Sequence, residues 1–293
     1  PYHTTRNRAH EVCLSRWKQT SAAARFAVPV CVCHNASMKT TLLQDRFEWL
    51  CYGCGAQAPL DDVFTCPGCG EPRSLHALTP FDAGSLRGRP DTMWDYWPWL
   101  PVGTREHAVS LGEGATPLVA APTLASRYGF GELLLKNEAA NPTGSFKDRQ
   151  VSVGVSHARE SGAETVSVVS SGNVAAATSA YAARAGLKAV VFMHAYASAS
   201  KAAQAAVHGA RVLRVDSPSP KQVFDLARAA CERWGWSDLS TAGIYEPYNV
   251  EGAKTIAYEL YAQCGGALPD WIVAPVGGGG LLGGVWRGLL DMQ

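Results

Sequence analysis

The sequence predicts an α/β protein built on a wound parallel sheet, with a small metal-binding unit ahead of it. From residue 133 onward, short apolar runs alternate with helix-like segments of about ten residues, which is the order of strands joined by crossover helices. Before that point, two C-x-x-C-G units have the spacing of a metal-binding ribbon. Ligands of wound sheets bind beyond the carboxyl ends of the strands, so the residues that follow each strand are the candidates for a site.

The predicted strands are short and apolar, and the predicted helices are rich in alanine or amphipathic. The strands cover residues 133–136, 165–169, 189–193, 211–216 and 271–276. The helices cover residues 151–161, 174–184, 200–208, 221–234, 251–263 and 281–292. Gly186 and Gly209 follow two of these helices, where glycine commonly ends a helix.

The composition is that of a globular protein. The 293 residues are 47% hydrophobic and 17% charged, which suits about two domains. The net charge of +1 argues against binding to nucleic acid or to a membrane surface through bulk electrostatics. No apolar stretch approaches the roughly 20 residues that cross a bilayer. We expect a cytoplasmic protein whose partner is a small molecule, and a homodimer is left open.

Four cysteines make up the two C-x-x-C-G units: Cys51 with Cys54, and Cys66 with Cys69. The glycine after each pair lets backbone amides turn toward the sulfurs, so two such turns give a tetrahedral site of four thiolates. Zinc is the usual occupant, and four protein ligands leave no open position, which predicts a structural metal. Rubredoxin-type iron and a pair of disulfides are the alternatives, although no secretory signal is evident.

The first 37 residues differ from the rest, because five basic residues stand there against one acid, Glu11. Such a start suits a transit peptide. Met38 opens a stretch that looks like a natural start, so an upstream translation artefact explains residues 1–37 equally well. We leave them out of the fold and expect four further parts. These are a zinc ribbon (38–79), a connector with the first part of a large domain (80–150), a small domain (151–250) and the second part of the large domain (251–293).

A lysine in an unusual turn is the first candidate for chemistry. Residues 141–149 read Asn-Pro-Thr-Gly-Ser-Phe-Lys-Asp-Arg, and an apolar, helix-like run follows them. Proline and glycine mark a turn, so Lys147 is predicted at the mouth of a helix, where the helix dipole disfavours an ammonium. Such a lysine suits covalent chemistry that needs a neutral amine. A solvated lysine in an ordinary turn is the alternative.

The junction after the predicted strand 165–169 carries small polar residues. It reads Ser170, Ser171, Gly172 and Asn173. The amides at a helix start favour a carboxylate, and the Asn173 side chain can both donate and accept a hydrogen bond. A plain helix cap is the alternative, because serine and asparagine are preferred there.

The junction after the predicted strand 271–276 is a run of glycine. It reads Gly277, Gly278, Gly279 and Gly280, followed by Leu281. Consecutive glycines cost backbone entropy and expose amides toward an anion, which favours a phosphate site. Gly278, Gly280 and Gly283 also fit the G-x-G-x-x-G fingerprint of dinucleotide-binding proteins, so an NAD-binding oxidoreductase is a rival class. The acidic residue of that fingerprint would fall beyond residue 293.

One cofactor would use the lysine, the asparagine and the glycine run together. Pyridoxal phosphate carries an aldehyde, a ring hydroxyl and a phosphate, which are the groups these residues can hold. The chain resembles the tryptophan-synthase-β-like (fold type II) family of pyridoxal phosphate enzymes, and within it the threonine synthases. The resemblance rests on residues 112–118, 141–149, 170–173, 182–186, 251–255 and 277–280. It implies two wound parallel-sheet domains.

The resemblance also implies roles and a reaction. Lys147 would bind the cofactor covalently and move protons, and Asn173 would hydrogen-bond the ring hydroxyl. Glycines 277–280, with the amide of Leu281, would hold the phosphate. The implied enzyme is a carbon–oxygen lyase acting on a phosphate ester. It converts O-phosphohomoserine and water to threonine and phosphate by γ-elimination followed by β-addition of water.

Ser170 and Ser171 would lie near the substrate carboxylate by the same resemblance. Two features depart from the family: Gln150 stands where a glycine usually follows Asp-Arg, and plain glycines replace an asparagine-containing phosphate loop. They leave a serine/threonine dehydratase-like deaminase open as the alternative, and an inert zinc-ribbon adaptor is the alternative outside enzymes. The partner of the pyridine nitrogen is expected beyond residue 293, so we expect part of the large domain to be missing.

Overall fold

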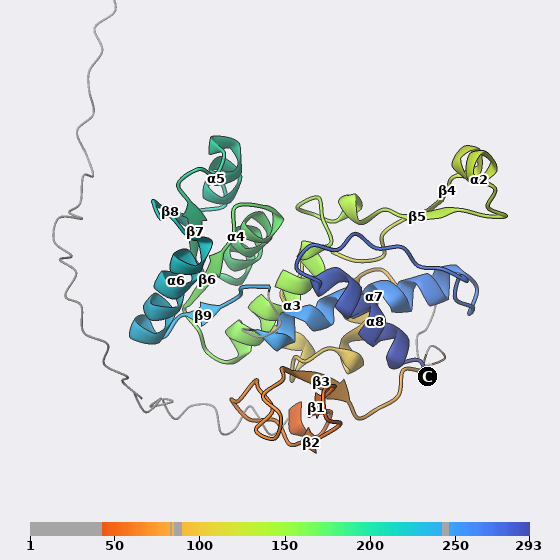
Figure 1. The fold of residues 1–293 in the computed structure, drawn as a ribbon, viewed down its shortest axis with the longest axis horizontal. Coiled ribbons are helices and arrows are strands. Elements are labelled where there is room, and N and C mark those ends of the chain that lie inside the picture. The colour runs from red at the N-terminus through yellow and green to blue at the C-terminus, as the bar shows by residue number, and fades with distance from the viewer. Residues whose placement is uncertain (1–42, 83, 85–89, 242–245) are drawn as a thin grey trace, which may run out of the picture. The chain divides into compact units, whose positions relative to one another are not determined.

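The fold is described from a computed structural model of the chain. The structure describes residues 43–82, 84, 90–241 and 246–293 (Figure 1). The expectations for residues 1–37, a transit peptide or an artefact, lie outside the described residues. The division of the rest into ribbon, connector, large domain and small domain stays a prediction.

The cysteine unit, residues 43–78, is built on a three-stranded antiparallel sheet. Strand β1 (Phe47–Cys51) lies between β2 (Gln57–Ala58) and β3 (Arg73–Ala77), the orange elements in Figure 1. Alternate residues of β1 are buried, as expected for a strand with one face on a core. That small core consists of Leu43, Phe47, Trp49, Leu60 and Leu75.

Residues 90–110 connect this unit to the rest through two short 3-10 helices. These are η2 (Met93–Trp99) and η3 (Arg105–His107). The side chains of Trp94 and Trp99 in η2 are buried. The Arg46 guanidinium donates hydrogen bonds to five carbonyl oxygens of the connector, those of Trp97, Pro98, Leu100, Val102 and Gly103. The cysteine unit is thereby fastened to the connector.

A four-stranded parallel sheet organises residues 165–238, with the strand order β8-β7-β6-β9. Its strands are β6 (Thr165–Val169), β7 (Lys188–His194), β8 (Arg211–Val215) and β9 (Ser237–Asp238). The helices that follow them are α4 (Asn173–Ala185), α5 (Ala199–Ala206) and α6 (Pro220–Trp234). Val191 of β7 packs on the side of α4, and Val190 packs on α6. The sheet therefore lies between helices on both faces, which confirms the α/β class with a parallel sheet (Figure 1).

Three further helices pack closely together beside the sheet: α3 (Lys147–Glu160), α7 (Pro247–Gln263) and α8 (Gly280–Leu290). Glycines make the close approach possible. A Cβ atom on Gly252 of α7 would meet the carbonyl oxygen of Arg149, and one on Gly284 of α8 would meet Ala253. Helix α3 also packs against α4, so it joins the sheet layers to the α7–α8 pair.

A small hairpin-like unit precedes α3. Strands β4 (Leu118–Ala120) and β5 (Leu134–Lys136) pair antiparallel, with α2 (Pro122–Tyr128) between them in the chain. The strand expected at 133–136 is therefore present, but it does not belong to the parallel sheet.

Two expectations about the elements are wrong. Residues 271–276 form no strand, because a strand needs a hydrogen-bonded neighbour and no described segment pairs with them. The side chains of Trp271 and Val273 are accordingly 84% and 94% exposed. The helix expected at 151–161 begins earlier, at Lys147, so the lysine is part of the helix rather than the turn before it.

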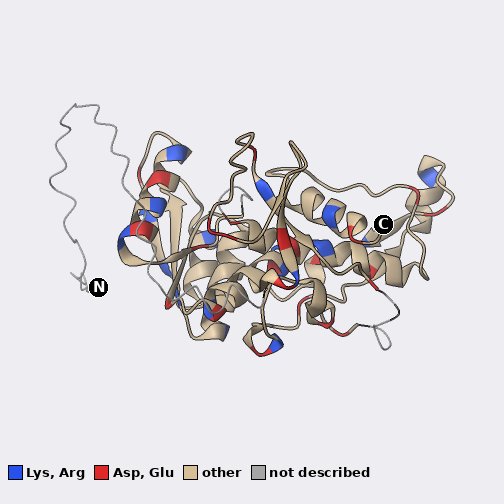
Figure 2. Ribbon diagram, turned by 90° about the horizontal axis from the view of Figure 1, so that it is seen from below, with Lys and Arg blue, Asp and Glu red and all other residues tan. Residues whose placement is uncertain are grey.

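Charged residues of both signs are interspersed along the described ribbon (Figure 2), in keeping with the net charge of +1. No helix in the described ranges is long and apolar enough to span a membrane.

Candidate active site

Lys147 is the first residue of α3, and its amine has neutral partners. The Nζ atom donates to Oε1 of Gln150 at 2.8 Å and to Oγ1 of Thr241 at 3.2 Å. It makes no ion pair with any described residue. Burial lowers the pKa of Lys147 to about 8, because a charged amine loses hydration there without gaining a counter-ion. The residue therefore has the neutral surroundings that the sequence argument requires.

The turn before the lysine is held by its own side chains. Gly144 adopts a φ of +85°, which glycine tolerates best, and its N–H donates to the carbonyl oxygen of Asn141 at 2.8 Å. The carboxylate of Asp148 accepts from both the N–H and the hydroxyl of Thr143. Ser145 Oγ accepts from the Lys147 N–H at 3.2 Å. Ser145 is thus a local hydrogen-bond partner of the first turn of α3.

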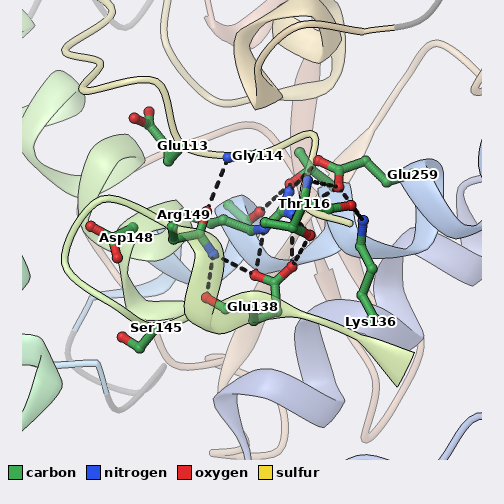
Figure 3. Close-up of polar contacts among 12 residues, drawn as sticks. Glu113, Gly114, Thr116, Lys136, Glu138, Ser145, Asp148, Arg149 and Glu259 are labelled. Carbon is green, nitrogen blue, oxygen red and sulfur yellow. Dashed lines mark hydrogen bonds and ion pairs between the residues drawn. The ribbon is translucent and has the colours of Figure 1, made fainter. Parts of the chain in front are cut away.

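Arg149, two residues after the lysine, is fully buried in a network of charged and polar groups (Figure 3). Its guanidinium pairs with the carboxylates of Glu138 and Glu259, and Lys136 also pairs with Glu259. Burial alone would raise the pKa of Glu259, but Arg149 and Lys136 outweigh it and hold that pKa at about 2. The arginine of the nine-residue motif therefore anchors α3 to α7 and to the segment before the turn.

The glycine run forms an open loop at the start of α8. Gly279 has a φ of +82° and precedes a helix whose first turn has no side-chain cap. A Cβ on Gly277, Gly278 or Gly279 would meet nothing within 4 Å, so this backbone is accessible. A cavity of about 240 Å³ adjoins the loop and is lined on its other side by residues 72–74 of the cysteine unit. An uncapped helix start with free backbone amides is a ready site for an anion.

Gln150 connects the lysine to the glycine loop. Its Nε2 donates to the carbonyl oxygen of Gly280 at 3.3 Å, while its Oε1 accepts from Lys147. The structure thereby brings together two of the predicted features, Lys147 and the loop 277–280, which lie far apart in the chain.

Asn173 is placed differently. It is the first residue of α4 and is exposed, and it makes no hydrogen bond to Lys147 or to the glycine loop within the described residues. The helix is preceded by Gly172 without a side-chain cap, so the alternative of a plain serine or asparagine cap is wrong. Ser170 Oγ accepts instead from the Gly172 N–H at 3.1 Å, and Ser171 is exposed. The start of α4, like that of α8, has no side-chain cap.

Sequence reasoning missed two residues at the lysine. Gln150 was noticed only as a departure from a family pattern, and its spacing of three from Lys147 places both on one side of a helix. Thr241 gave no signal, because it follows β9, a strand of two residues that is too short to show a period.

The four cysteines of the two C-x-x-C-G units come together. All four sulfur atoms lie within 4.8 Å of one another, with Cys51 to Cys69 at 3.4 Å and Cys54 to Cys66 at 3.6 Å. Sulfurs about 2.3 Å from a tetrahedral zinc ion would be roughly 3.8 Å apart, so the spacing fits that ion. None of the four is in a disulfide.

Both cysteine turns use the same hydrogen bonds. Gly55 and Gly70 have φ near +74° and +79°, and their N–H groups donate to the carbonyl oxygens of Cys51 and Cys66. In the second turn the amides of Cys69 and Gly68 point at the Cys66 sulfur, and they lower the pKa of that thiol to about 7. Backbone amides of the second turn therefore point toward sulfur, as the sequence predicts.

A half-buried lysine with a lowered pKa and neutral partners, beside an uncapped glycine loop in an α/β fold with a parallel sheet, defines an enzyme class that binds a phosphorylated carbonyl cofactor. The chain belongs to the family of pyridoxal-phosphate dependent enzymes, whose model matches residues 109–293.

Individual proteins agree with this assignment. The chain is 35% identical over 252 residues to a threonine synthase of Methanocaldococcus jannaschii, covering 83% of this chain and 60% of that protein. It is 39% identical over 200 residues to a threonine synthase of Synechocystis sp., covering 68% of this chain and 51% of that protein. The crystal structure of Escherichia coli diaminopropionate ammonia lyase has the same fold, with a TM-score of 0.57 at 20% identity, covering 63% of this chain and 58% of that one. The chain thus spans about 60% of the length of the archaeal relative.

Proposed function

We propose that this protein is a pyridoxal-phosphate dependent lyase of the threonine-synthase type, which converts O-phosphohomoserine and water to threonine and phosphate. The observation that carries the proposal is the Lys147 amine, held by neutral partners and linked through Gln150 to the glycine loop. The threonine synthases among its relatives support the choice of substrate.

The residues present fit the cofactor. The amine of Lys147 has a pKa of about 8 and no counter-ion, which suits covalent capture of an aldehyde. Glycines 277–279 leave room for a phosphate against the backbone at the uncapped start of α8. When bound, pyridoxal phosphate supplies the electron sink for the reaction.

The chain's own groups would bind, orient and move protons. The loop 277–280 and the amide of Leu281 would hold the phosphate, and the Asn173 side chain would donate to the ring hydroxyl. Ser170 and Ser171, before the uncapped start of α4, would bind the substrate carboxylate. Lys147 Nζ, whose pKa burial lowers to about 8, would accept a proton from the substrate and return it.

We also propose that Cys51, Cys54, Cys66 and Cys69 hold one structural zinc ion. The support is the fit of their sulfur spacing to a tetrahedral site and the repeated turn geometry. Four thiolates fill the coordination sphere, so the metal would stabilise the cysteine unit and would not take part in the reaction.

A serine/threonine dehydratase-like deaminase is the second candidate, and the all-glycine loop is the observation that favours it. The assay that separates the two compares products from the purified protein. A threonine synthase releases phosphate from O-phosphohomoserine, whereas the deaminase releases ammonia and a keto acid from threonine. Lys147→Ala should abolish either activity, and Lys221→Ala, an exposed control, should not. Phosphate release that survives in Lys147→Ala would overturn the proposal.

A further inference from the structure

Gln150 is a fully buried amide whose two ends face two different parts of the candidate site. Its carbonyl end accepts from Lys147 Nζ at 2.8 Å, and its amino end donates to the carbonyl oxygen of Gly280 at 3.3 Å. Among the described side chains, this one alone is bonded both to the lysine and to the glycine loop. The function proposed above rests on this link, but it assigns the Gln150 side chain no part in binding or proton transfer.

Two glycines of neighbouring helices lie close to Gln150. Gly252 of α7 presses against α3 at this point, and a Cβ there would lie 3.0 Å from the Gln150 Cα. A Cβ on Gly280 would lie 3.0 Å from the Gln150 Nε2 and 3.6 Å from the Thr241 carbonyl oxygen. The glutamine side chain therefore lies between α3 and the start of α8, close enough that Gly280 has no space for a side chain of its own.

The Gln150 side chain has to be uncharged as well as long enough to contact both Lys147 and Gly280. A carboxylate at the same place would accept from Lys147 as an ion pair and favour the ammonium form. It would also turn a second oxygen toward the carbonyl oxygen of Gly280, where Gln150 now donates an N–H. The amide is thus the side chain of this length that satisfies both neighbours and leaves the amine without a counter-ion.

We propose that Gln150 is a positioning residue that sets the distance between the Lys147 amine and the glycine loop, so that one phosphorylated aldehyde reaches both. The inference rests on the proposed function for its purpose. The link itself is a property of the cofactor-free protein, and it can be tested there.

The chain offers a matched control in Gln263. That side chain makes the same kind of bridge, accepting from Lys136 Nζ at 2.9 Å and donating to the Thr116 carbonyl oxygen at 2.8 Å. It lies at the other end of α7, away from the glycine loop. Gln150→Met and Gln263→Met therefore remove equivalent hydrogen bonds, only one of which involves the site.

The test uses cofactor-free protein and two readouts. The first is loop exchange, measured as amide hydrogen exchange of Gly283 and Gly284, whose N–H groups bond back to the glycine loop in the first turn of α8. It should speed up about three- to tenfold in Gln150→Met and stay unchanged in Gln263→Met. The second is the pH dependence of Lys147 acylation, followed by mass spectrometry. In Gln150→Glu the half-maximal pH should rise, because the new carboxylate stabilises the ammonium, while loop exchange still speeds up. A separate titration should show pyridoxal phosphate affinity reduced about tenfold in Gln150→Met.

Each outcome decides something. Unchanged loop exchange in both Gln150 variants would overturn the link. Faster exchange with an unchanged acylation profile in Gln150→Glu would make Gln150 a packing residue and would also overturn the proposal. A third outcome combines faster loop exchange and a raised half-maximal pH of acylation with a wild-type Lys147 that does not bind pyridoxal phosphate. It would support Gln150 as the positioning residue and refute the proposed function.

Discussion

The cysteine unit and the lysine site reach their geometry in different ways. Four cysteine sulfurs come together from two short turns, and each turn repeats the same hydrogen bond from a glycine N–H to a cysteine carbonyl oxygen. The lysine site collects Lys147 and Gln150 from α3, Thr241 from the segment after β9, and Gly280 from α8. A site made of local turns depends on its own sequence, whereas a site assembled from distant segments depends on how closely the helices pack.

The two regions are nevertheless joined. Arg287 of α8 donates to the carbonyl oxygen of Leu75 in β3 at 2.8 Å and pairs with Glu251 of α7. Helix α8 begins at the glycine loop, so the cysteine unit is fastened to the helix that presents the loop. The predictions below break one region at a time and ask whether the other follows.

The largest effect is expected from Cys54→Ser. Three remaining thiolates bind zinc much more weakly, so the metal content should fall from one ion per chain to none. Hydrogen exchange should rise in β1 and β3, while α3 and β6 stay protected because their cores are separate. Zinc content by atomic absorption and exchange by mass spectrometry test this, with Cys264→Ser as the control. Full zinc content in Cys54→Ser would contradict the assignment.

The next largest effect is expected from Arg149→Met, in the free energy of unfolding. It leaves the carboxylates of Glu138 and Glu259 without their buried partner, and breaking such a pair costs about 3–5 kcal/mol in the free energy of unfolding. Arg105→Met breaks an exposed pair with Asp95 and should cost less than about 1 kcal/mol. Urea titration of both variants measures the difference. Equal midpoints would show that Arg149 does not anchor α3.

Two neighbouring glycines of α8 should respond in opposite directions. A Cβ on Gly284 would meet Ala253 of α7, so Gly284→Ala should destabilise by about 1–3 kcal/mol through overpacking. A Cβ on Gly283 would meet nothing within 4 Å, so Gly283→Ala should stabilise the helix by about 0.5–1 kcal/mol. Thermal unfolding of Gly284→Ala and Gly283→Ala tests whether α8 packs closely on α7 at Gly284. An equal loss of stability in both variants would refute this packing.

The smallest effect is a shift in the pH at which the Lys147 amine becomes reactive. Because burial lowers the pKa of Lys147 to about 8, acylation of its amine should be half-maximal near pH 8. An ordinary lysine reaches that point near pH about 10.4. The sign follows from burial, which favours the neutral amine and so moves the transition toward acid. Peptide mapping after acylation at a series of pH values gives the curve, and a midpoint above 10 would remove the case for a neutral amine.

The sequence predicted the local features well. Strand 165–169 appears as β6 with those bounds, and the helix expected at 174–184 is α4, ended by Gly186 in the left-handed conformation. Both depend on short-range patterns and on the backbone freedom of glycine. The sulfur cluster was predictable for the same reason.

The failures depend on distant contacts. An apolar run at 271–276 predicts a strand, but pairing requires a neighbour that no described segment supplies. Thr241 lies beside Lys147 only because β9 pairs with β6, a contact between segments about seventy residues apart. Of the two hydrogen-bond partners of Lys147, Gln150 follows from its spacing of three within α3, whereas Thr241 depends on packing between distant segments.

Borohydride reduction tests the central claim most directly. The protein is incubated with pyridoxal phosphate, reduced, digested and mapped by mass spectrometry. We predict one pyridoxyl group per chain on Lys147, and none on any lysine of Lys147→Ala. A label that persists in that variant, or a wild-type protein that takes no label on Lys147, would contradict the account.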